Sequence, residues 1–492
     1  MTARCLFYVG LLALFGIATG GPSRSLADAL GPSDLVPPLC ASSVHAGDYA
    51  PAYAMDGDTR SRWASSGFRG RPEWLQIDFG RVVGIDKIVL YWERAYAAEY
   101  DIQVSDDGIA WQTVHQQRDG KGERETVGGL AARGRYLRVL CLKPGPFGLF
   151  SIWEIGFPEG EAQQVLAEAR RRAEAARRKA EAEAMAPVLK QLGEQGIGEI
   201  VFALRQPGKD GHWYANFGYY AEDENRLTYG PGGKLCRMKL DTGDVTVLLD
   251  DPQGAVRDPV VHYDARKILF SYRKGESPYY HLYEIDIDGN NLRQLTDGPY
   301  DDIEPCYLPD DRIVFISSRC HRWVNCWLTQ VGILYRCNGD GSDIHPISAN
   351  IEHDNTPWPL PDGRILYQRW EYVDRSQVDY HHLWTANPDG TGQMVYYGNQ
   401  HPSTLMIDAK PAPDNRKVVA IFSPGHGRRE HDGVITLVDP RQGPDNRDSA
   451  RAITQQSNYR DPWAFSERAF MAAQGQRIVL LNEQGQAMTL FQ

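Results

Sequence analysis

The chain has 492 residues, of which 42% are hydrophobic and 24% are charged, and its formal net charge is −11 at pH 7. This composition is that of a globular protein, and the length favours roughly two to four domains. The negative charge disfavours nucleic acid and an anionic membrane surface as main partners, because both attract basic patches.

The N-terminus has the pattern of a secretory signal peptide. Arg4 precedes an apolar run from Cys5 to Ala18, and small residues follow at 19–21. We assign the signal peptide to residues 1–27. The alternative is an uncleaved anchor, but the run is shorter than the about 20 residues that span a bilayer. The sequence therefore predicts a secreted or periplasmic protein with no membrane span after cleavage.

Residues 38–158 alternate short apolar runs with Gly, Asp and Pro turns, which predicts a β-sandwich. We expect strands at 74–79, 83–91, 100–104, 111–115 and 136–142. Cys40 opens this module and Cys141 lies in the last expected strand. Because export permits disulfides, we predict a bond between them that contributes about 4–5 kcal/mol by closing a loop of roughly 100 residues.

Residues 159–193 are dominated by Ala, Glu, Arg and Gln, which are strong helix formers with interleaved opposite charges. Large apolar residues are nearly absent from the centre of this segment. It therefore predicts a solvated helical linker, with a helix laid against a domain or a coiled-coil contact as alternatives. Pro187 is expected to break or restart the helix.

Residues 198–492 contain six versions of one repeat, which predicts a six-bladed β-propeller with four short strands per blade. Five units begin at a proline, namely Pro259, Pro305, Pro357, Pro411 and Pro462, and the first unit begins at Ile200. The first unit lacks an obvious innermost strand. Ring closure must then use residues 186–197, packing alone, or sequence beyond the C-terminus.

The motifs DGDTRSRW, WLQIDFG, YDIQVSDDGIAW, RYLRV and SIWEI occur in this order in the first module. They resemble the discoidin (coagulation factor V/VIII C-type) domain and the related family 32 carbohydrate-binding modules. The resemblance implies a structural Ca²⁺ at Asp56, Asp58, Ser61 and Glu154, whose oxygens suit calcium; an Asx-type turn without metal is the alternative. It also implies a glycan site on the loops that carry Arg69, Arg71, Trp92, Glu93 and Tyr96.

The segment LYEIDIDGNNLRQLTDGPYDDIEPCYLPDDRIVFIS resembles TolB-like, WD40-like propeller repeats. The propeller resembles the middle domain of hydrazine synthase alpha subunits and their planctomycete relatives in six segments, namely RQPGKDGHWYANFGYY, DDIEP, SSRCHRWVNCW, EHDNTPW, RWEYVDRSQVDYHHLW and SPGHGRREH. Such proteins can be multi-haem redox enzymes. The chain contains no C-x-x-C-H motif, so covalent c-type haem is not encoded.

The longest propeller loops fall between the second and third strands of each repeat, so we expect them on one face. Candidate ligand-binding residues there are His212, Arg322, Arg369 and Arg375, and candidate catalytic residues are His381, His382, His426, His431 and Glu371. Asp302, Asp354 and Asp408 each precede a blade's proline by three residues, and we expect them to cap local backbone. Cys320 and Cys326 could form a disulfide, stay as thiols or bind zinc.

Taken together, the sequence predicts an exported binding protein. Its discoidin-like module would bind a glycan or cell-surface polysaccharide, and its propeller would bind a second ligand or a protein partner on the loop-rich face. The alternative is a periplasmic enzyme or redox-complex subunit with a metal or acid/base site on that face.

Overall fold

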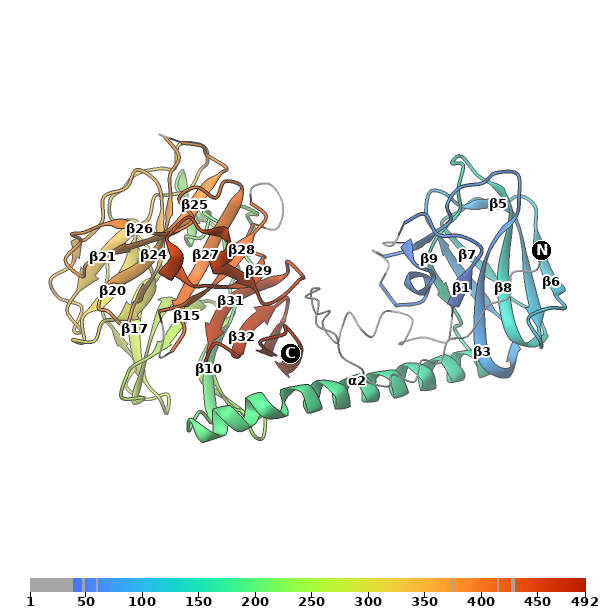
Figure 1. Cartoon of the computed structure of the whole chain (residues 1–492), viewed down its shortest axis with the longest axis horizontal. Helices are drawn as coiled ribbons and strands as arrows, with labels where there is room; N and C mark the ends of the chain where they lie inside the picture. The colour runs from blue at the N-terminus through green and yellow to red at the C-terminus, as the bar shows by residue number, and fades with distance from the viewer. Residues whose placement is uncertain (1–38, 47–48, 59–60, 374, 414–415, 426–429) are drawn as a thin grey trace.

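The structure is a computed structural model that describes residues 39–46, 49–58, 61–373, 375–413, 416–425 and 430–492. A β-sandwich and a β-propeller are joined by one long helix (Figure 1). The predicted, mainly β fold class is confirmed. The predicted signal peptide lies outside the described residues.

Two antiparallel sheets form the sandwich. One has the order β1 (Leu39–Ala41), β3 (Glu73–Ile85), β8 (Ala132–Pro144), β5 (Ala97–Ser105) and β6 (Gln112–Gln117). The other has the order β2 (Trp63–Ala64), β9 (Ser151–Gly156), β4 (Ile88–Trp92) and β7 (Arg124–Val127), and the short helix η3 (Pro51–Ala54) precedes β2. Trp63, Tyr100 and Phe150 are fully buried in one core cluster of this module.

The predicted disulfide between Cys40 and Cys141 is wrong. Strand β3 lies between β1 and β8 in the sheet, with Cys40 opposite Gln76 and Cys141 opposite Glu73. Two strand spacings alone separate the Cα atoms by about 10 Å, and the three-residue offset along the strands adds to this, so a disulfide cannot reach. Cys141 is instead a buried free thiol, and burial raises its pKa.

Helix α2 (Gly160–Glu194) bridges the two domains. Its first turns bury Ala162 and Leu166 in the sandwich core, and its last turns bury Met185, Val188 and Leu192 against the propeller. The middle is largely exposed, so α2 is a solvated linker that packs on a domain at each end. The predicted break at Pro187 is wrong, because α2 continues through it; the neighbouring buried side chains offset the lost backbone hydrogen bond.

The propeller has six blades. The first contains β10 (Glu199–Leu204), β13 (Gly233–Lys239) and β14 (Val245–Asp251), with the hairpin β11 (Tyr219–Tyr220) and β12 (Asp223–Leu227) inserted after β10. The second contains β15 (Ala255–Val261), β16 (Lys267–Arg273), β17 (His281–Asp286) and β18 (Arg293–Gln294). The third contains β19 (Asp302–Tyr307), β20 (Ile313–Ser317), β21 (Ile333–Cys337) and β22 (His345–Pro346).

The last three blades follow the same order. The fourth contains β23 (Asp354–Pro359), β24 (Ile365–Trp370), β25 (Tyr380–Ala386) and β26 (Met394–Tyr397). The fifth contains β27 (Thr404–Pro411), β28 (Val418–Ser423), β29 (Val434–Val438) and β30 (Ala450–Ala452), with short helices η4 (Pro440–Gln442) and η5 (Arg447–Ser449) between β29 and β30. The sixth contains β31 (Tyr459–Ala464), β32 (Ala469–Gln474), β33 (Arg477–Asn482) and β34 (Ala487–Phe491).

Each innermost strand of blades two to six has a β-bulge at the same place. The first bulge residue is left-handed in all five, with φ between 47° and 57° at Asp258, Glu304, Thr356, Asp408 and Asp461. Proline follows it in four blades, where the unpaired bulge position needs no backbone donor. In the fifth blade alanine follows the bulge residue Asp408, so Asp408 is equivalent to Glu304 and not to Asp302. The predicted repeat, which placed Pro411 at the position of the other prolines, was therefore wrong by two residues.

The ring closes by packing. Among the described residues, no strand pairs the sixth blade with the first. The last turns of α2 share a core cluster with Ile200 and Phe202 of β10 and Leu480 of β33, and Phe202 stacks near Phe491 with ring centres 4.9 Å apart. Of the three routes of closure expected from the sequence, the structure thus combines packing with residues of the helix end.

Candidate functional sites

The loop predicted to bind calcium has its oxygen-bearing groups together. The Ser61 hydroxyl donates to Asp56 at 2.6 Å, and the Gly57 amide donates to Glu154 at 3.2 Å. Burial, together with the charges of Asp56 and Asp58, raises the pKa of Glu154 to about 7. A bound cation would relieve this concentration of negative charge. However, no three acidic, His or Cys side chains among the described residues lie close enough together to hold a metal ion as they stand.

One basic side chain also reaches this loop. Arg170, from α2, donates to the Met55 carbonyl at 2.7 Å and lies 3.8 Å from the Glu154 carboxylate. The guanidinium partly offsets the negative charge, and the contact ties the helix to the loop. The predicted metal ligands Asp56, Ser61 and Glu154 therefore lie at the joint between sandwich and linker.

The loops predicted to bind a glycan meet at one end of the sandwich. The Phe68 amide donates to the Gly148 carbonyl at 2.6 Å, and the Gly145 amide donates to the Tyr96 carbonyl at 2.8 Å. These bonds join loops 67–71 and 145–149 to the start of β5. We call this end the sandwich tip.

The predicted tip residues differ in exposure. Arg69 and Arg71 are exposed, whereas Trp92 is only 4% exposed and packs on Tyr100 in the core. Glu93 accepts a hydrogen bond from the Ala95 amide at 2.9 Å and thereby shapes its own loop. Trp92 and Glu93 therefore support the tip, while the arginines face solvent.

The sequence reasoning missed Phe147. Its side chain is 50% exposed on loop 145–149, next to the Gly145–Tyr96 hydrogen bond. The sequence did contain an indication of this residue. The segment Gly145-Pro-Phe-Gly148 is a turn, and a turn does not require an aromatic side chain.

On the propeller, most predicted ligand-binding arginines are held by carboxylates. Arg369 makes two hydrogen bonds to Asp354, at 2.8 and 3.0 Å, and Arg375 donates to Glu371 at 2.9 Å. Arg319 and Asp302 form the equivalent pair in the third blade. The carboxylates of Asp302 and Asp354 thus bind arginine side chains, where we expected them to cap local backbone, and Arg369 is a buried partner and not a surface ligand contact. Arg322 is half-buried in the loop after β20.

A segment of the first blade covers the loop-rich end of the propeller axis. Residues 212–218 cross it: the Trp213 amide donates to Glu430 at 2.9 Å, and His353 Nε2 bonds the Tyr214 carbonyl at 2.7 Å. Trp213 and Tyr214 lie in the largest core cluster of the propeller. We call residues 212–218 the plug. His212 stays at its edge, 2.6 Å from Asp210 and 32% exposed.

The candidate catalytic histidines are buried. His381 is fully buried and stacks on Trp370 with ring centres 5.2 Å apart. His382 is 1% exposed and lies 3.5 Å from Glu371, and burial with Arg375 nearby lowers its pKa to about 3. His426 lies outside the described residues. Both rings are buried within an aromatic cluster, so His381 and His382 lack the solvent access that acid/base catalysis needs.

A buried acid on the same face was missed. Glu352 is fully buried, and burial raises its pKa to about 7 despite the opposing backbone N–H of Asn325. Exposed Cys326 lies nearby, within 3.7 Å of the Tyr214 hydroxyl. Cys320 donates to the Val331 carbonyl, so both cysteines are thiols and do not form the local disulfide.

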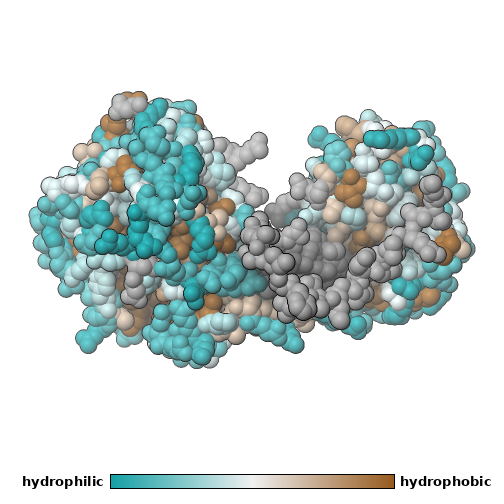
Figure 2. All heavy atoms as spheres, in the orientation of Figure 1, coloured by the Kyte–Doolittle hydropathy of each residue, from teal (hydrophilic) through white to brown (hydrophobic). Residues whose placement is uncertain are grey.

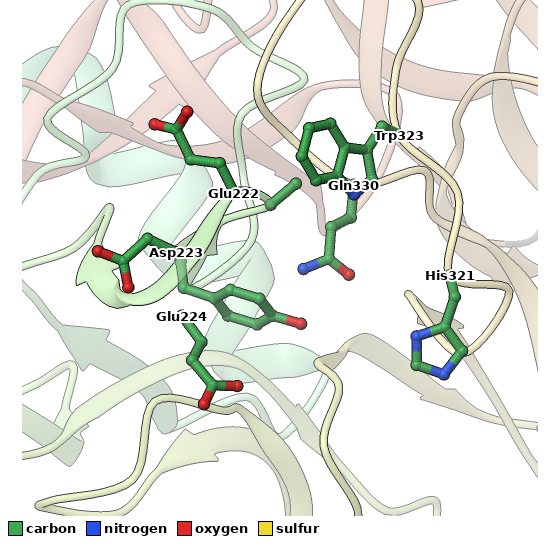
Figure 3. A pocket seen from close by; sticks show the side chains of 8 residues that line it. Glu222, Asp223, Glu224, His321, Trp323 and Gln330 are labelled. Atoms are coloured by element: carbon green, nitrogen blue, oxygen red, sulfur yellow. The ribbon is translucent and has the colours of Figure 1, made fainter.

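An open pocket of about 390 Å³ lies on the loop-rich face (Figure 3). Glu222, Asp223 and Glu224 line one side, from the β11–β12 hairpin. His321 and Trp323 line the other side, and Trp323 is 52% exposed. The pocket is therefore acidic with an aromatic wall, which suits a cationic or hydrogen-bond-donating ligand.

A second cavity, of about 300 Å³, follows the propeller axis beneath the plug. The five left-handed bulge residues line it, together with His431 and with Arg205, Arg257, Lys410 and Arg460. Arg257 pairs with Asp258 at 2.7 Å and Glu304 at 3.3 Å. Burial and the neighbouring Asp461 raise the pKa of Asp408 to about 7, and burial lowers that of His431 to about 4.

Polar and apolar side chains are mixed on the molecular surface. On the face drawn in Figure 2, hydrophobic side chains are scattered among hydrophilic ones. Among the described residues, no helix combines the length and apolar character of a membrane span.

Comparison with known proteins identifies the sandwich. Residues 39–155 match the family model of the F5/8 type C domain. A 93-residue stretch is 31% identical to the polysaccharide lyase 8 family protein HylA of Enterococcus faecalis, covering 18% of this chain and 7% of that protein. Another of 103 residues is 28% identical to hydrazine synthase subunit alpha of Kuenenia stuttgartiensis, covering 20% of this chain and 11% of that protein. The chain thus spans about a tenth or less of either relative.

Solved structures resemble both domains. Chitosan-binding module 1 of a chitosanase/glucanase from Paenibacillus sp. IK-5 is 31% identical over 25% of this chain and 96% of that one, with a TM-score of 0.23. TolB from Acinetobacter baumannii is 12% identical over 70% of this chain and 72% of that one, with a TM-score of 0.43. The F5/8 type C domain and the TolB-like propeller are the two folds that the sequence motifs resembled.

Proposed function

We propose that this chain is an exported binding protein whose F5/8 type C domain holds a glycan at the sandwich tip. The exposed ring of Phe147 carries the proposal. An aromatic face can stack on the apolar face of a sugar, and Arg69 and Arg71 on the neighbouring loop can donate hydrogen bonds to its hydroxyls. Hydrogen bonds between the loops hold these groups on a rigid scaffold.

Replacing Phe147 by alanine is expected to weaken glycan binding at least 10-fold, which is about 1.4 kcal/mol, because the stacking surface is lost. Immobilised galactosyl and glucosaminyl oligosaccharides identify a ligand, and isothermal titration of the full chain gives its affinity. Ile109→Ala is the matched control, because Ile109 is 84% exposed on the β5–β6 turn at the other end of β5. Equal loss in both variants, or no loss in Phe147→Ala, would contradict a site at the tip.

We further propose that Asp56, Asp58, Ser61 and Glu154 hold a structural Ca²⁺. Calcium is expected to raise the melting temperature of the full chain, and Glu154→Gln is expected to abolish that rise, because the cation binds the folded state. Differential scanning calorimetry with calcium and with chelator measures both. Glu159→Gln, on an exposed carboxylate that pairs with Lys87, is the control that should keep the rise. An equal rise in Glu154→Gln would place the metal elsewhere.

The propeller would bind a second ligand or protein partner on its loop-rich face. The acidic pocket with exposed Trp323 supports this role (Figure 3). The alternative, an acid/base enzyme on this face, has one observation in its favour, namely buried Glu352 with a pKa near 7 beside Cys326. A turnover that Glu352→Gln abolishes and Phe147→Ala leaves unchanged would favour the enzyme.

A further inference from the structure

The first blade lacks its innermost strand. In blades two to six an inner strand is followed by the second strand, which runs to the loop-rich face and pairs with the third. Strand β10 pairs with β13 and leads into the plug. In the second blade, the second strand β16 does the same: it pairs with β17 and leads into the loop 274–280. By this register β10 is a second strand, and no strand among the described residues occupies the position inside it.

A slot occupies that vacant position. Val201 and Ala203 of β10 line one wall of the axial cavity, and Met471 and Ala473 of β32 line another. Inner strands of successive blades pack on each other from β15 to β31, but no comparable contact joins β31 to β10 in the described residues. β10 therefore has a strand on only one side, so it presents an edge to the cavity.

The axial cavity has polar groups without partners among the described residues, one beside the slot and two on the fourth blade. Arg205 has no ion pair among the described residues, and its guanidinium lies over the Tyr229 ring at 5.1 Å. Gln368 is 1% exposed with both amide atoms unpartnered, and Asn355 is 2% exposed with a free carbonyl oxygen; both line the cavity. Buried amides without partners are costly, so the cavity is built for a hydrogen-bonding occupant.

The inner strands of blades two to six show which residues suit the inner-strand position. Four of the five carry an acidic residue at the left-handed bulge position, and four carry proline next, as in Arg257-Asp-Pro259 and Arg460-Asp-Pro462. Arg257 meets the carboxylates of its own strand and the next. An acidic residue at the sixth position would give Arg205 the partner that it lacks.

We propose that this slot binds an extended segment of a partner polypeptide, which adds to β10 as the inner strand of the first blade. Backbone hydrogen bonds to β10 supply affinity, and an Asp-Pro pair at the bulge supplies specificity through Arg205. This site is separate from the sandwich tip and from the acidic pocket.

The test uses the full chain and a fluorescein-labelled peptide with the sequence of residues 458–464, Asn-Tyr-Arg-Asp-Pro-Trp-Ala. Fluorescence anisotropy should show saturable binding, and a peptide with Asn in place of its Asp should bind at least 10-fold more weakly. Arg205→Ser should weaken binding similarly, while Arg226→Ser, on an exposed arginine of the same blade that pairs with Glu222, should not.

Hydrogen exchange gives a second readout. The bound peptide should slow exchange of the β10 amides, and Ala203→Trp, which fills the slot, should prevent both effects. Absence of binding would overturn the proposal, as would binding that ignores Arg205 and leaves β10 unchanged. Full protection of β10 before peptide is added would show that a segment of this chain fills the slot. Glycan binding in the same sample is independent of each outcome.

Discussion

Asp354→Ala is expected to lower the free energy of unfolding by about 3–5 kcal/mol, because it leaves a buried guanidinium without its carboxylate. Asp354 is fully buried and receives two hydrogen bonds from Arg369, which is itself 8% exposed. The Arg369 guanidinium would keep a hydrogen bond to Gln393, at 2.9 Å, and its contact with the Trp384 ring, but no carboxylate bonded to it among the described residues. Urea unfolding followed by circular dichroism measures the change.

The matched control is Asp362→Ala. Asp362 pairs with Arg364 across a turn of the same blade, but its side chain is 54% exposed, so the loss should be at most about 1 kcal/mol. The double variant Asp354→Ala with Arg369→Ala should be less destabilised than the sum of the single variants. Equal effects at Asp354 and Asp362 would show that the buried pair does not stabilise the fourth blade.

Trp213→Ala is expected to cost about 3–5 kcal/mol, because it removes a large ring from the plug and leaves a cavity. Trp213 is 3% exposed and packs edge-on against Trp370 and His381, with ring centres 5.7 and 5.3 Å away. These partners belong to the fourth blade, so the substitution cuts a link across the propeller axis. Thermal unfolding measures the loss.

Trp323→Ala makes the same substitution at a ring that is 52% exposed, and it should change stability by less than about 1 kcal/mol. The two variants also separate roles, because Trp323 lines the acidic pocket and Trp213 does not. If Trp213→Ala were as stable as Trp323→Ala, the plug would be a loop lying loosely over the axis.

Local pattern was enough to predict the architecture, since strand periodicity, the Ala/Glu/Arg-rich helix and the repeat each depend on neighbouring residues. Sheet order is not local, and the predicted bond between Cys40 and Cys141 was wrong because β3 separates them. The repeat was aligned on proline, so Asp408 was assigned to the position of Asp302 when it occupies the bulge.

The candidate sites were harder to predict, because their chemistry depends on burial. His381 and His382 have a residue type that suits catalysis, and they follow a loop on the loop-rich face. However, the plug, which comes from another blade, packs on buried His381, and Glu371 lies beside buried His382. Glu352 begins the segment EHDNTPW, which resembles a known family, but the sequence did not show that its carboxylate is buried. Phe147 could have been found as an aromatic residue inside a glycine-flanked turn.

Hydrogen exchange of the full chain with and without a bound oligosaccharide tests the central claim most directly. The account predicts slower exchange in loops 67–71, 93–97 and 145–149 of the sandwich tip, and unchanged exchange in the propeller. Protection confined to the propeller's loop-rich face, with none at the tip, would contradict a glycan-binding F5/8 type C domain and favour an active centre on that face.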